Sequence, residues 1–594
     1  MIAVHNRCLV WLCRLAALLV LSGTSAVSAA QRPNIVLVLA DDLGFTDLAS
    51  YGSEINTPSL SELAQQGISF TNYHTGANCA PSRAMLLTGV DSHRSGVPNI
   101  PEMIPPEQAQ HSHYSGTMGQ NVVTVATLLQ DAGYHTYLAG KWHLGNSPDQ
   151  LPSRRGFERT VALGASGADN WEQKPYLPIY KKADWYADGE EYQLPDDFYS
   201  SRFLIDKSIE FIDSNRGDGQ PFFAYVPFQA VHIPVQAPQK YIDRYMGVYD
   251  GGWTLLRERR LARAIELGIV PAGSSMVTMA STANWDDLDS QQQAYEAKRM
   301  AVYGAMVEAM DFHIGRLVEY LKAIGEYDNT IFIFSSDNGA EAMGRPVQNS
   351  WINRRGLASQ NYSTDYETLG LKGSFNAINP GFASAAASPL AYYKFYVGEG
   401  GLRVPLIIAG EPLKKKNQLT NASAYVTDVT PTILALTGVE SPPARYGGRL
   451  IEPMIGRSLV PLIDGTAEAV YGPDDAVGFE LAGHGALFMG DYKIVFNRGT
   501  QGDDRWRLFN IVADPGETND LSADNPAQLQ LMLGRYQQYV TDNKILPVAS
   551  DYRHERQVIF YGLQTVYRDN ILIFILLVLF LLPFVVVRLS KSKR

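Results

Sequence analysis

The sequence predicts an α/β protein, built as an α/β/α sandwich with a large mixed central sheet. Two apolar runs rich in β-branched residues, 34–40 and 330–335, are typical of strands that are buried on both faces of a sheet. Amphipathic helix patterns at 124–131, 201–212 and 301–324 lie among such runs. This alternation favours helices on both faces of the sheet. The composition, 45% hydrophobic and 19% charged, excludes a disordered chain and a coiled coil.

The first 30 residues have the layout of a secretory signal peptide. A short basic region with Arg7 precedes apolar residues, and small residues end at Ala29 and Ala30. The apolar run at 15–21 is too short to span a bilayer. We therefore expect cleavage near Ala29 or Ala30 and export of the remaining chain.

The C-terminal end contains an apolar run at 571–587. Its 17 residues carry no charge, and a rise of ~1.5 Å per residue gives roughly 26 Å, near the lower limit for a bilayer core. Four basic side chains follow it. The positive-inside rule then puts the C-terminus in the cytoplasm. The sequence predicts a tether at 551–570, one transmembrane helix at 571–587 and a basic cytoplasmic tail at 588–594. We therefore expect an anchored protein whose main part lies on the periplasmic or extracytoplasmic side of the membrane.

Charge and cysteine content exclude two classes of protein. The net charge is −11, and no Lys/Arg-rich stripe occurs in the body of the chain, which argues against nucleic acid as a partner. Three cysteines, Cys8, Cys13 and Cys79, cannot form a disulfide framework. Because two of them belong to the predicted signal peptide, Cys79 is expected to be the one cysteine of the mature chain.

Oxygen ligands follow the two apolar strands directly. Asp41 and Asp42 come after 34–40, and Asp337 and Asn338 come after 330–335. A single Asp after a strand is most often a turn or cap residue, but two such pairs favour one site, because ligand sites lie at the carboxyl ends of strands in α/β sheets. Three carboxylates and an amide suit a hard cation. We expect Ca²⁺, with Mg²⁺ as the second option.

Two further strand-like runs end near basic side chains. The run 135–139 is followed by Lys141 and His143, and the run 222–226 leads to His232. Taken singly, each of these side chains is more often structural than functional. Because basic side chains follow both of these strand-like runs, they are candidates for the same site.

The segment around Cys79 reads Cys-Ala-Pro-Ser-Arg-Ala-Met-Leu-Leu-Thr-Gly and ends at Gly89. A tyrosine-phosphatase loop is excluded, because it needs five residues between Cys and Arg and here three separate Cys79 from Arg83. A simple thiolate nucleophile at a helix N-terminus is one interpretation. The segment closely resembles, however, the signature of the sulfatase family, the formylglycine-dependent enzymes of the alkaline-phosphatase-like superfamily.

The resemblance extends over residues 32–521. Segments 40–44 and 337–339 resemble the metal motifs of the family, and 140–145 resembles its Lys-x-His motif. His232 stands where the family has its second histidine, and 249–268 is most similar to bacterial arylsulfatases.

The second sulfate-binding lysine of the family has two candidates in this sequence. Lys394, shortly before 399–405, resembles it, and Lys372 competes for the role. A long Gly/Ala/Ser-rich stretch separates the two lysines, so the sequence alone leaves this choice open.

The resemblance implies a mechanism of sulfate-ester hydrolysis. A maturation enzyme would oxidise Cys79 to Cα-formylglycine, whose hydrate attacks sulfur next to a cation on Asp41, Asp42, Asp337, Asn338 and residue 79. Arg83, Lys141 and Lys394 would hold the sulfuryl oxygens. His232 or Lys394 would protonate the leaving oxygen, and His143 would deprotonate the second hydroxyl. The acidic net charge weakly favours small esters as substrates.

The resemblance also implies two units, a catalytic domain at 31–402 and a smaller C-terminal α+β subdomain with an antiparallel sheet at 403–550. Strand patterns at 492–496 and 507–511 agree with the second unit. Two other functions stay open at this point. One is hydrolysis of phosphonate or phosphate esters on the same scaffold, and the other is a catalytically silent surface protein that binds sulfated ligands.

Overall fold

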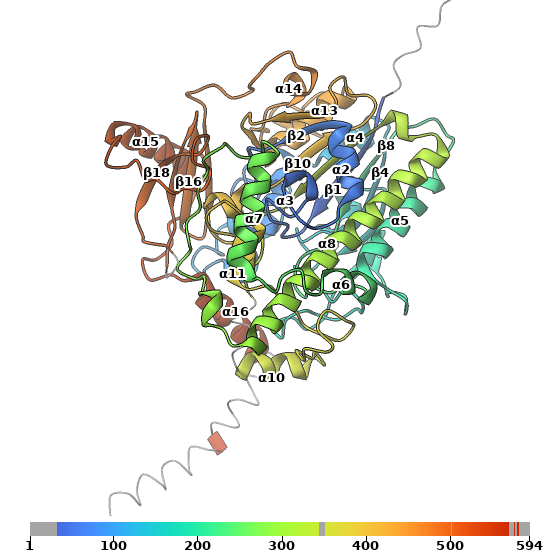
Figure 1. Cartoon of the computed structure of the whole chain (residues 1–594). Coiled ribbons are helices and arrows are strands. Elements are labelled where there is room, and N and C mark those ends of the chain that lie inside the picture. The colour runs from blue at the N-terminus through green and yellow to red at the C-terminus, as the bar shows by residue number, and fades with distance from the viewer. Residues whose placement is uncertain (1–31, 344–350, 500–501, 569–574, 576–578, 581–594) are drawn as a thin grey trace, which may run out of the picture.

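The computed structural model describes residues 32–343, 351–499, 502–568, 575, 579 and 580 (Figure 1). A ten-stranded mixed sheet forms its centre, in the order β11-β2-β10-β9-β1-β8-β4-β5-β6-β7. The strands are β1 (Asn34–Ala40), β2 (Gly67–Phe70), β4 (His135–Lys141), β5 (Arg159–Leu163), β6 (Trp185–Ala187), β7 (Glu190–Glu191), β8 (Phe222–Pro227), β9 (Thr330–Ser336), β10 (Leu406–Ala409) and β11 (Gln418–Thr420).

The middle of this sheet is parallel. β9, β1, β8, β4 and β5 pair in parallel, whereas β10 and β6 join the two sides in antiparallel orientation. Every residue of β1 and β9 is buried, as expected of strands covered on both faces. The carboxyl ends of the parallel strands therefore meet at one edge of the sheet.

Alternate side chains of β1 enter two different cores. Val36 and Val38 face one helical layer, and Ile35 and Leu37 face the other, which is the period of two of a strand. The first layer contains α2 (Pro58–Gln65), α5 (Ser200–Ser214), α6 (Gln239–Tyr245), α7 (Gly252–Glu266), α8 (Ser290–Ile324) and α11 (Pro380–Ala386). The second contains α3 (Cys79–Thr88), α4 (Val125–Asp131), α13 (Val429–Thr437) and α14 (Val460–Asp464).

The longest helix of the described residues, α8, shows how local sequence sets its ends. Asp289 and Gln292 form a reciprocal capping box at its start, and Gly325 adopts the left-handed conformation (φ 76°) at its end. The prediction began this helix at residue 301 because its first turns are polar and partly exposed.

A small antiparallel sheet follows the main body. It consists of β15 (Ala476–Leu481), β16 (His484–Met489), β17 (Tyr492–Phe496) and β18 (Trp506–Asn510), with α15 (Pro526–Asp542) packed on it. Shorter elements are β3 (Tyr73–His74), β12 (Ala424–Tyr425), β13 (Arg445–Tyr446), β14 (Arg449–Leu450), α10 (Trp351–Ser359) and α12 (Glu399–Leu402). The large mixed sheet and this antiparallel sheet agree with the sequence-based expectation.

The prediction of a membrane anchor in the C-terminal segment is wrong. In the parts of the chain that are described, no helix combines the length and the apolar character needed to cross a membrane. This finding overturns the transmembrane helix at 571–587 and the anchored, extracytoplasmic location inferred from it. The prediction relied on hydropathy alone, for a run at the lower limit of spanning length.

Several expected segments lie outside the described residues. They are the signal peptide at 1–30, most of 571–587 and the tail at 588–594. The expected tether at 551–570 contains α16 (His554–Arg568), which packs against the 3₁₀ helix η2 (Pro101–Met103). The predicted boundary between a catalytic domain and a C-terminal subdomain, after residue 402, stays a prediction. In the structure, β10 and β11 follow this boundary in sequence but still belong to the large sheet.

Buried ion pairs attach the small sheet to the main body. Lys493 of β17 is fully buried and contacts Glu399 at 2.9 Å and Glu517 at 2.8 Å. Glu399 also accepts a hydrogen bond from His74 at 3.0 Å. Since an uncompensated buried charge is costly, this junction depends on all of its members.

Replacing Lys493 by Met would leave Glu399 and Glu517 without their shared cation. We expect the free energy of unfolding to fall by about 3–5 kcal/mol in urea denaturation. Lys414→Met, at a side chain that is 75% exposed, is the matched control and should change it by less than about 0.5 kcal/mol. A loss below about 1 kcal/mol in Lys493→Met would contradict this account of the junction.

His93 gives a second contact with the small sheet, to Glu480 of β15, a pH dependence. Burial disfavours its imidazolium, but hydrogen bonds to Asp91 and Glu480 raise the pKa of His93 to about 9. The raised pKa contributes stability that is complete below the unfolded pKa of about 6.5 and is lost as the pH rises towards 9.

We therefore expect His93→Gln to lose on the order of 1–3 kcal/mol of stability at pH 6, and progressively less as the pH approaches 9. Thermal unfolding of both proteins across this pH range measures the difference. A difference that stays constant from pH 6 to 9 would exclude His93 as the titrating group.

Candidate active site

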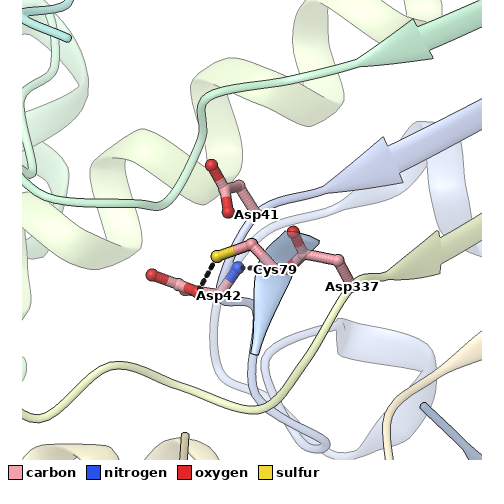
Figure 2. A group of neighbouring side chains, drawn as sticks. All are labelled: Asp41, Asp42, Cys79 and Asp337. Carbon is pink, nitrogen blue, oxygen red and sulfur yellow. Dashed lines mark hydrogen bonds between the residues drawn. The ribbon is translucent and has the colours of Figure 1, made fainter. Parts of the chain in front are cut away.

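Four chemically active side chains meet at the carboxyl edge of the central strands (Figure 2). Asp41 and Asp42 follow β1, Asp337 follows β9, and Cys79 is the first residue of α3. One ligand atom from each lies within 4.8 Å of the others, and all four residues are buried. The two pairs of oxygen ligands expected from the sequence therefore lie together with the candidate nucleophile.

Backbone hydrogen bonds fix the two aspartate loops to each other. The Asp42 amide donates to Asp337 Oδ1 at 3.2 Å (Figure 2), and the Leu43 amide donates to Ser336 Oγ at 2.9 Å. Asp42 adopts a left-handed conformation with φ 63°, which Asp tolerates better than most residues. The result is a carboxylate aimed at the Cys79 sulfur, with Asp42 Oδ1 3.8 Å from Sγ.

Cys79 starts its helix in a fully buried setting. Its amide donates to the side chain of Asn78, the N-cap residue, and all ten residues of α3 are buried. Burial raises the pKa of the Cys79 thiol well above its ordinary value, although Lys141 and Lys394 oppose this effect. A protonated thiol is a poor nucleophile, so the structure argues against the simple thiolate interpretation.

Three buried cations pair with the carboxylates of the site. Arg83 Nη2 lies 2.7 Å from Asp337 Oδ2, and Lys141 Nζ lies 2.7 Å from Asp41 Oδ2. Lys394 Nζ lies 2.8 Å from Asp42 Oδ1. Each of these three cations is thus held at the site by at least one carboxylate.

The structure separates the two lysine candidates. Lys372 is 56% exposed and pairs with Glu172, whereas the Lys394 side chain is 2% exposed. Tyr392 and Phe395, on either side of Lys394, have left-handed backbones with φ 68° and 74°. Such strain in bulky residues is usual where surrounding structure fixes a functional loop.

Both candidate histidines are neutral in this setting. Burial is the main cause that holds the pKa of His143 and of His232 well below the ordinary value, and the positive charge of Lys141 is the second. His232 Nδ1 donates to the Ile233 carbonyl at 2.7 Å, and its Nε2 lies 3.9 Å from Asp42 Oδ2. His143 Nδ1 is buried without a hydrogen-bond partner. Neutral imidazoles can accept protons, as catalytic bases must.

The donor set suits a hard divalent cation. Asn338 donates through Nδ2 to Asp42 Oδ1 at 2.7 Å, while its Oδ1 is buried and without a partner. An unpaired amide oxygen beside three carboxylates is the ligand chemistry of Ca²⁺ or Mg²⁺. Burial also raises the pKa of Asp41 to about 7, so added positive charge would favour its ionised form.

One member of the cluster has no counterpart in the sequence-based expectation. Glu341, three residues after Asn338, is buried and its Oε2 lies 3.1 Å from Lys394 Nζ. A single Glu after a recognised motif belongs to no periodic or spaced pattern that would indicate a functional role. Only its position behind the second metal motif could have indicated it.

Comparison with known proteins agrees with this geometry. The family model described as Sulfatase matches residues 33–439. The chain is 34% identical to an uncharacterized sulfatase of Schizosaccharomyces pombe over 89% of this chain and 97% of that protein. It is also 34% identical to an arylsulfatase of Klebsiella aerogenes over 74% of this chain and 94% of that protein. The solved structure of Ps i-CgsB in complex with k-i-k-neocarrahexaose shares the fold, with a TM-score of 0.62, 24% identity, and coverage of 90% and 98%.

The orphaned Asn338 oxygen gives a direct test of cation binding. We expect Ca²⁺ to raise the thermal midpoint of chelator-treated protein, since binding at 100 times Kd stabilises by about 2.7 kcal/mol. Asn338→Ala should reduce this shift, and Asn519→Ala, at an exposed position, should not. An equal shift in both variants would remove Asn338 from the ligand set.

Proposed function

This chain belongs to the sulfatase family and is a sulfuric ester hydrolase, and we propose that it uses a Cα-formylglycine made from Cys79 together with one divalent cation. The observation that carries the proposal is the setting of Cys79. A buried, protonated thiol lies among three carboxylates and three cations. Such a setting suits a nucleophile that is made by modification better than a free thiolate.

The proposed ligands of the cation are Asp41, Asp42, Asp337, Asn338 and residue 79. Ca²⁺ is the first choice, and Mg²⁺ would need a stricter octahedral arrangement. A bound divalent cation supplies positive charge at the reacting group and favours the ionised form of a hydroxyl at residue 79.

The proposed nucleophile explains why residue 79 is special. Hydration of an aldehyde gives two hydroxyl groups on one carbon. One attacks sulfur, so that an oxygen–sulfur bond forms while the bond to the leaving oxygen breaks. The other, when deprotonated, restores the aldehyde and expels sulfate, which serine or cysteine cannot do.

The basic side chains of the site bind and orient the ester in this proposal. Arg83, Lys141 and Lys394 would donate to the sulfuryl oxygens, where negative charge is concentrated. All three are held by carboxylates already, so little reorganisation is needed when the ester binds. Fixed donors of this kind are the main source of electrostatic stabilisation in transition states.

Two proton transfers complete the proposed reaction. His143, neutral and with an unpaired Nδ1, would accept the proton of the second hydroxyl. Lys394 would donate a proton to the leaving oxygen, or His232 would do so after taking up a proton at Nε2, because its Nδ1 proton is held by the Ile233 carbonyl. Both lie beside Asp42, with Lys394 Nζ 2.8 Å from Oδ1 and His232 Nε2 3.9 Å from Oδ2.

The burial of Cys79 bears on the maturation enzyme that the proposal requires. The side chain is 1% exposed and the whole of α3 is buried. An enzyme cannot reach it in the folded protein, so the modification would precede folding. The two alternative functions, phosphonate or phosphate ester hydrolysis and silent binding of sulfated ligands, are not favoured by relatives that are named sulfatases.

The proposal is tested by peptide mass analysis of the segment with Cys79, combined with turnover of p-nitrophenyl sulfate. Protein made with a formylglycine-generating enzyme should carry an aldehyde at residue 79. Cys79→Ala should lose at least about 1000-fold in kcat, because removal of a nucleophile abolishes the chemical step.

Cys79→Ser controls for folding, because it changes one buried atom and should retain the thermal midpoint. Full turnover by protein with an intact thiol would contradict the proposed nucleophile. An aldehyde without turnover of any sulfate ester would contradict the proposed chemistry.

A further inference from the structure

Glu341 is a buried carboxylate beside the site that the proposed reaction does not use. Its side chain is 6% exposed, and Oε2 lies 3.1 Å from Lys394 Nζ. Polar atoms of Asp42, His232 and Glu341 lie within 4.8 Å of one another. The second oxygen, Oε1, is buried without a hydrogen-bond partner. Glu341 therefore adds a negative charge directly beside the lysine that is proposed to meet the substrate.

The charges around Cys79 nearly cancel when Glu341 is included. Among the described residues of the site, four carboxylates face three cations. The carboxylates are Asp41, Asp42, Asp337 and Glu341, and the cations are Arg83, Lys141 and Lys394. The two histidines are neutral. One negative charge remains, so the site would carry one positive charge with a divalent cation bound and the hydroxyls of residue 79 still protonated.

This balance matches one class of ester. A sulfate monoester carries one negative charge, and its complex with the loaded site would be neutral. A phosphate monoester is dianionic above its second pKa of about 6, and its complex would carry an uncompensated negative charge. Uncompensated charge in a buried site is strongly disfavoured.

We propose that Glu341 is a specificity-determining residue that makes this site select monoanionic sulfate esters over dianionic phosphate esters. The inference rests on the proposed function and names the substrate charge that its site accepts. The same charge opposes retention of the dianionic product, sulfate. Without Glu341, Lys394 would gain attraction for dianions, because its ammonium would face Asp42 alone.

The geometry does not favour a second cation between Asp42, His232 and Glu341. The Lys394 ammonium already lies between the two carboxylates, 2.8 Å from Asp42 Oδ1 and 3.1 Å from Glu341 Oε2. A metal ion there would be repelled by this ammonium. Glu341 is therefore assigned to the charge balance of the anion site.

The test compares Glu341→Gln with wild-type protein at pH 8 in saturating Ca²⁺, with p-nitrophenyl sulfate and p-nitrophenyl phosphate as probes. Removal of one buried charge should raise the ratio of kcat/KM for the phosphate to that for the sulfate by about 10- to 100-fold. Inorganic sulfate should inhibit the variant more strongly, with an inhibition constant lower by about 10-fold.

Equilibrium binding provides a readout that does not depend on turnover. In the Cys79→Ala background both probes bind without reacting, and calorimetry gives their affinities. Adding Glu341→Gln should increase the affinity for the dianionic phosphate ester, relative to that for the monoanionic sulfate ester, by the same 10- to 100-fold. If wild-type protein fails to hydrolyse p-nitrophenyl sulfate, the proposed function fails, but this binding ratio still tests Glu341.

Matched variants separate charge from shape. Glu341→Asp keeps the charge and should keep the wild-type ratio. Glu319→Gln, on a side chain that is 72% exposed, changes the net charge equally and should have no effect. Glu341→Ser serves as a second neutral variant should Glu341→Gln not fold.

Two results would overturn the inference. One is a ratio in the neutral variants within about 2-fold of wild type, since a buried unit charge is worth more than this. The other is an equal change in Glu341→Asp and Glu341→Gln, which would indicate that Glu341 only positions Lys394.

Discussion

Charge buried in an apolar interior is the constraint on which the rest of this structure depends. The carboxyl edge of β1 and β9 carries Asp41, Asp42 and Asp337, all nearly inaccessible to water. Carboxylates in such a place persist only with cations beside them. Arg83, Lys141 and Lys394 come from three different parts of the chain to supply that charge. The sheet order, the start of α3 and the strained loop around Lys394 all serve to bring these partners together.

Much of this arrangement could be predicted because it follows strand periodicity. β1 was expected at 34–40 and occurs there, and β9 extends the expected 330–335 by one residue. Polar residues directly after buried strands must lie at one sheet edge, so Asp41, Asp42 and Asp337 were identified without a structure. Lys141 and His232 were expected by the same reasoning, and motif spacing added Cys79 and Arg83.

The remainder could not be predicted, for physical reasons that differ from case to case. The choice between Lys372 and Lys394 depends on how a long Gly/Ala/Ser-rich stretch folds, and no periodicity describes that stretch. The place of Glu341 in the site depends on an ion pair with Lys394, which lies 53 residues further along the chain. The membrane helix was wrong because a hydrophobic run of minimal length is not by itself a span. The ordering of α16 against η2 depends on tertiary contacts that an amphipathic pattern does not reveal.

The C-terminal segment after the small sheet reaches the edge of the active site. His554 of α16 stacks on Phe395 with a centroid distance of 5.6 Å, and Phe395 is the neighbour of Lys394. Tyr552 donates a hydrogen bond to the Met103 carbonyl at 2.6 Å. For protein engineering, the segment that contains Tyr552 and α16 is therefore not a neutral attachment point. A fusion that replaces the segment after the small sheet would remove the contacts of His554 with Phe395 and of Tyr552 with Met103.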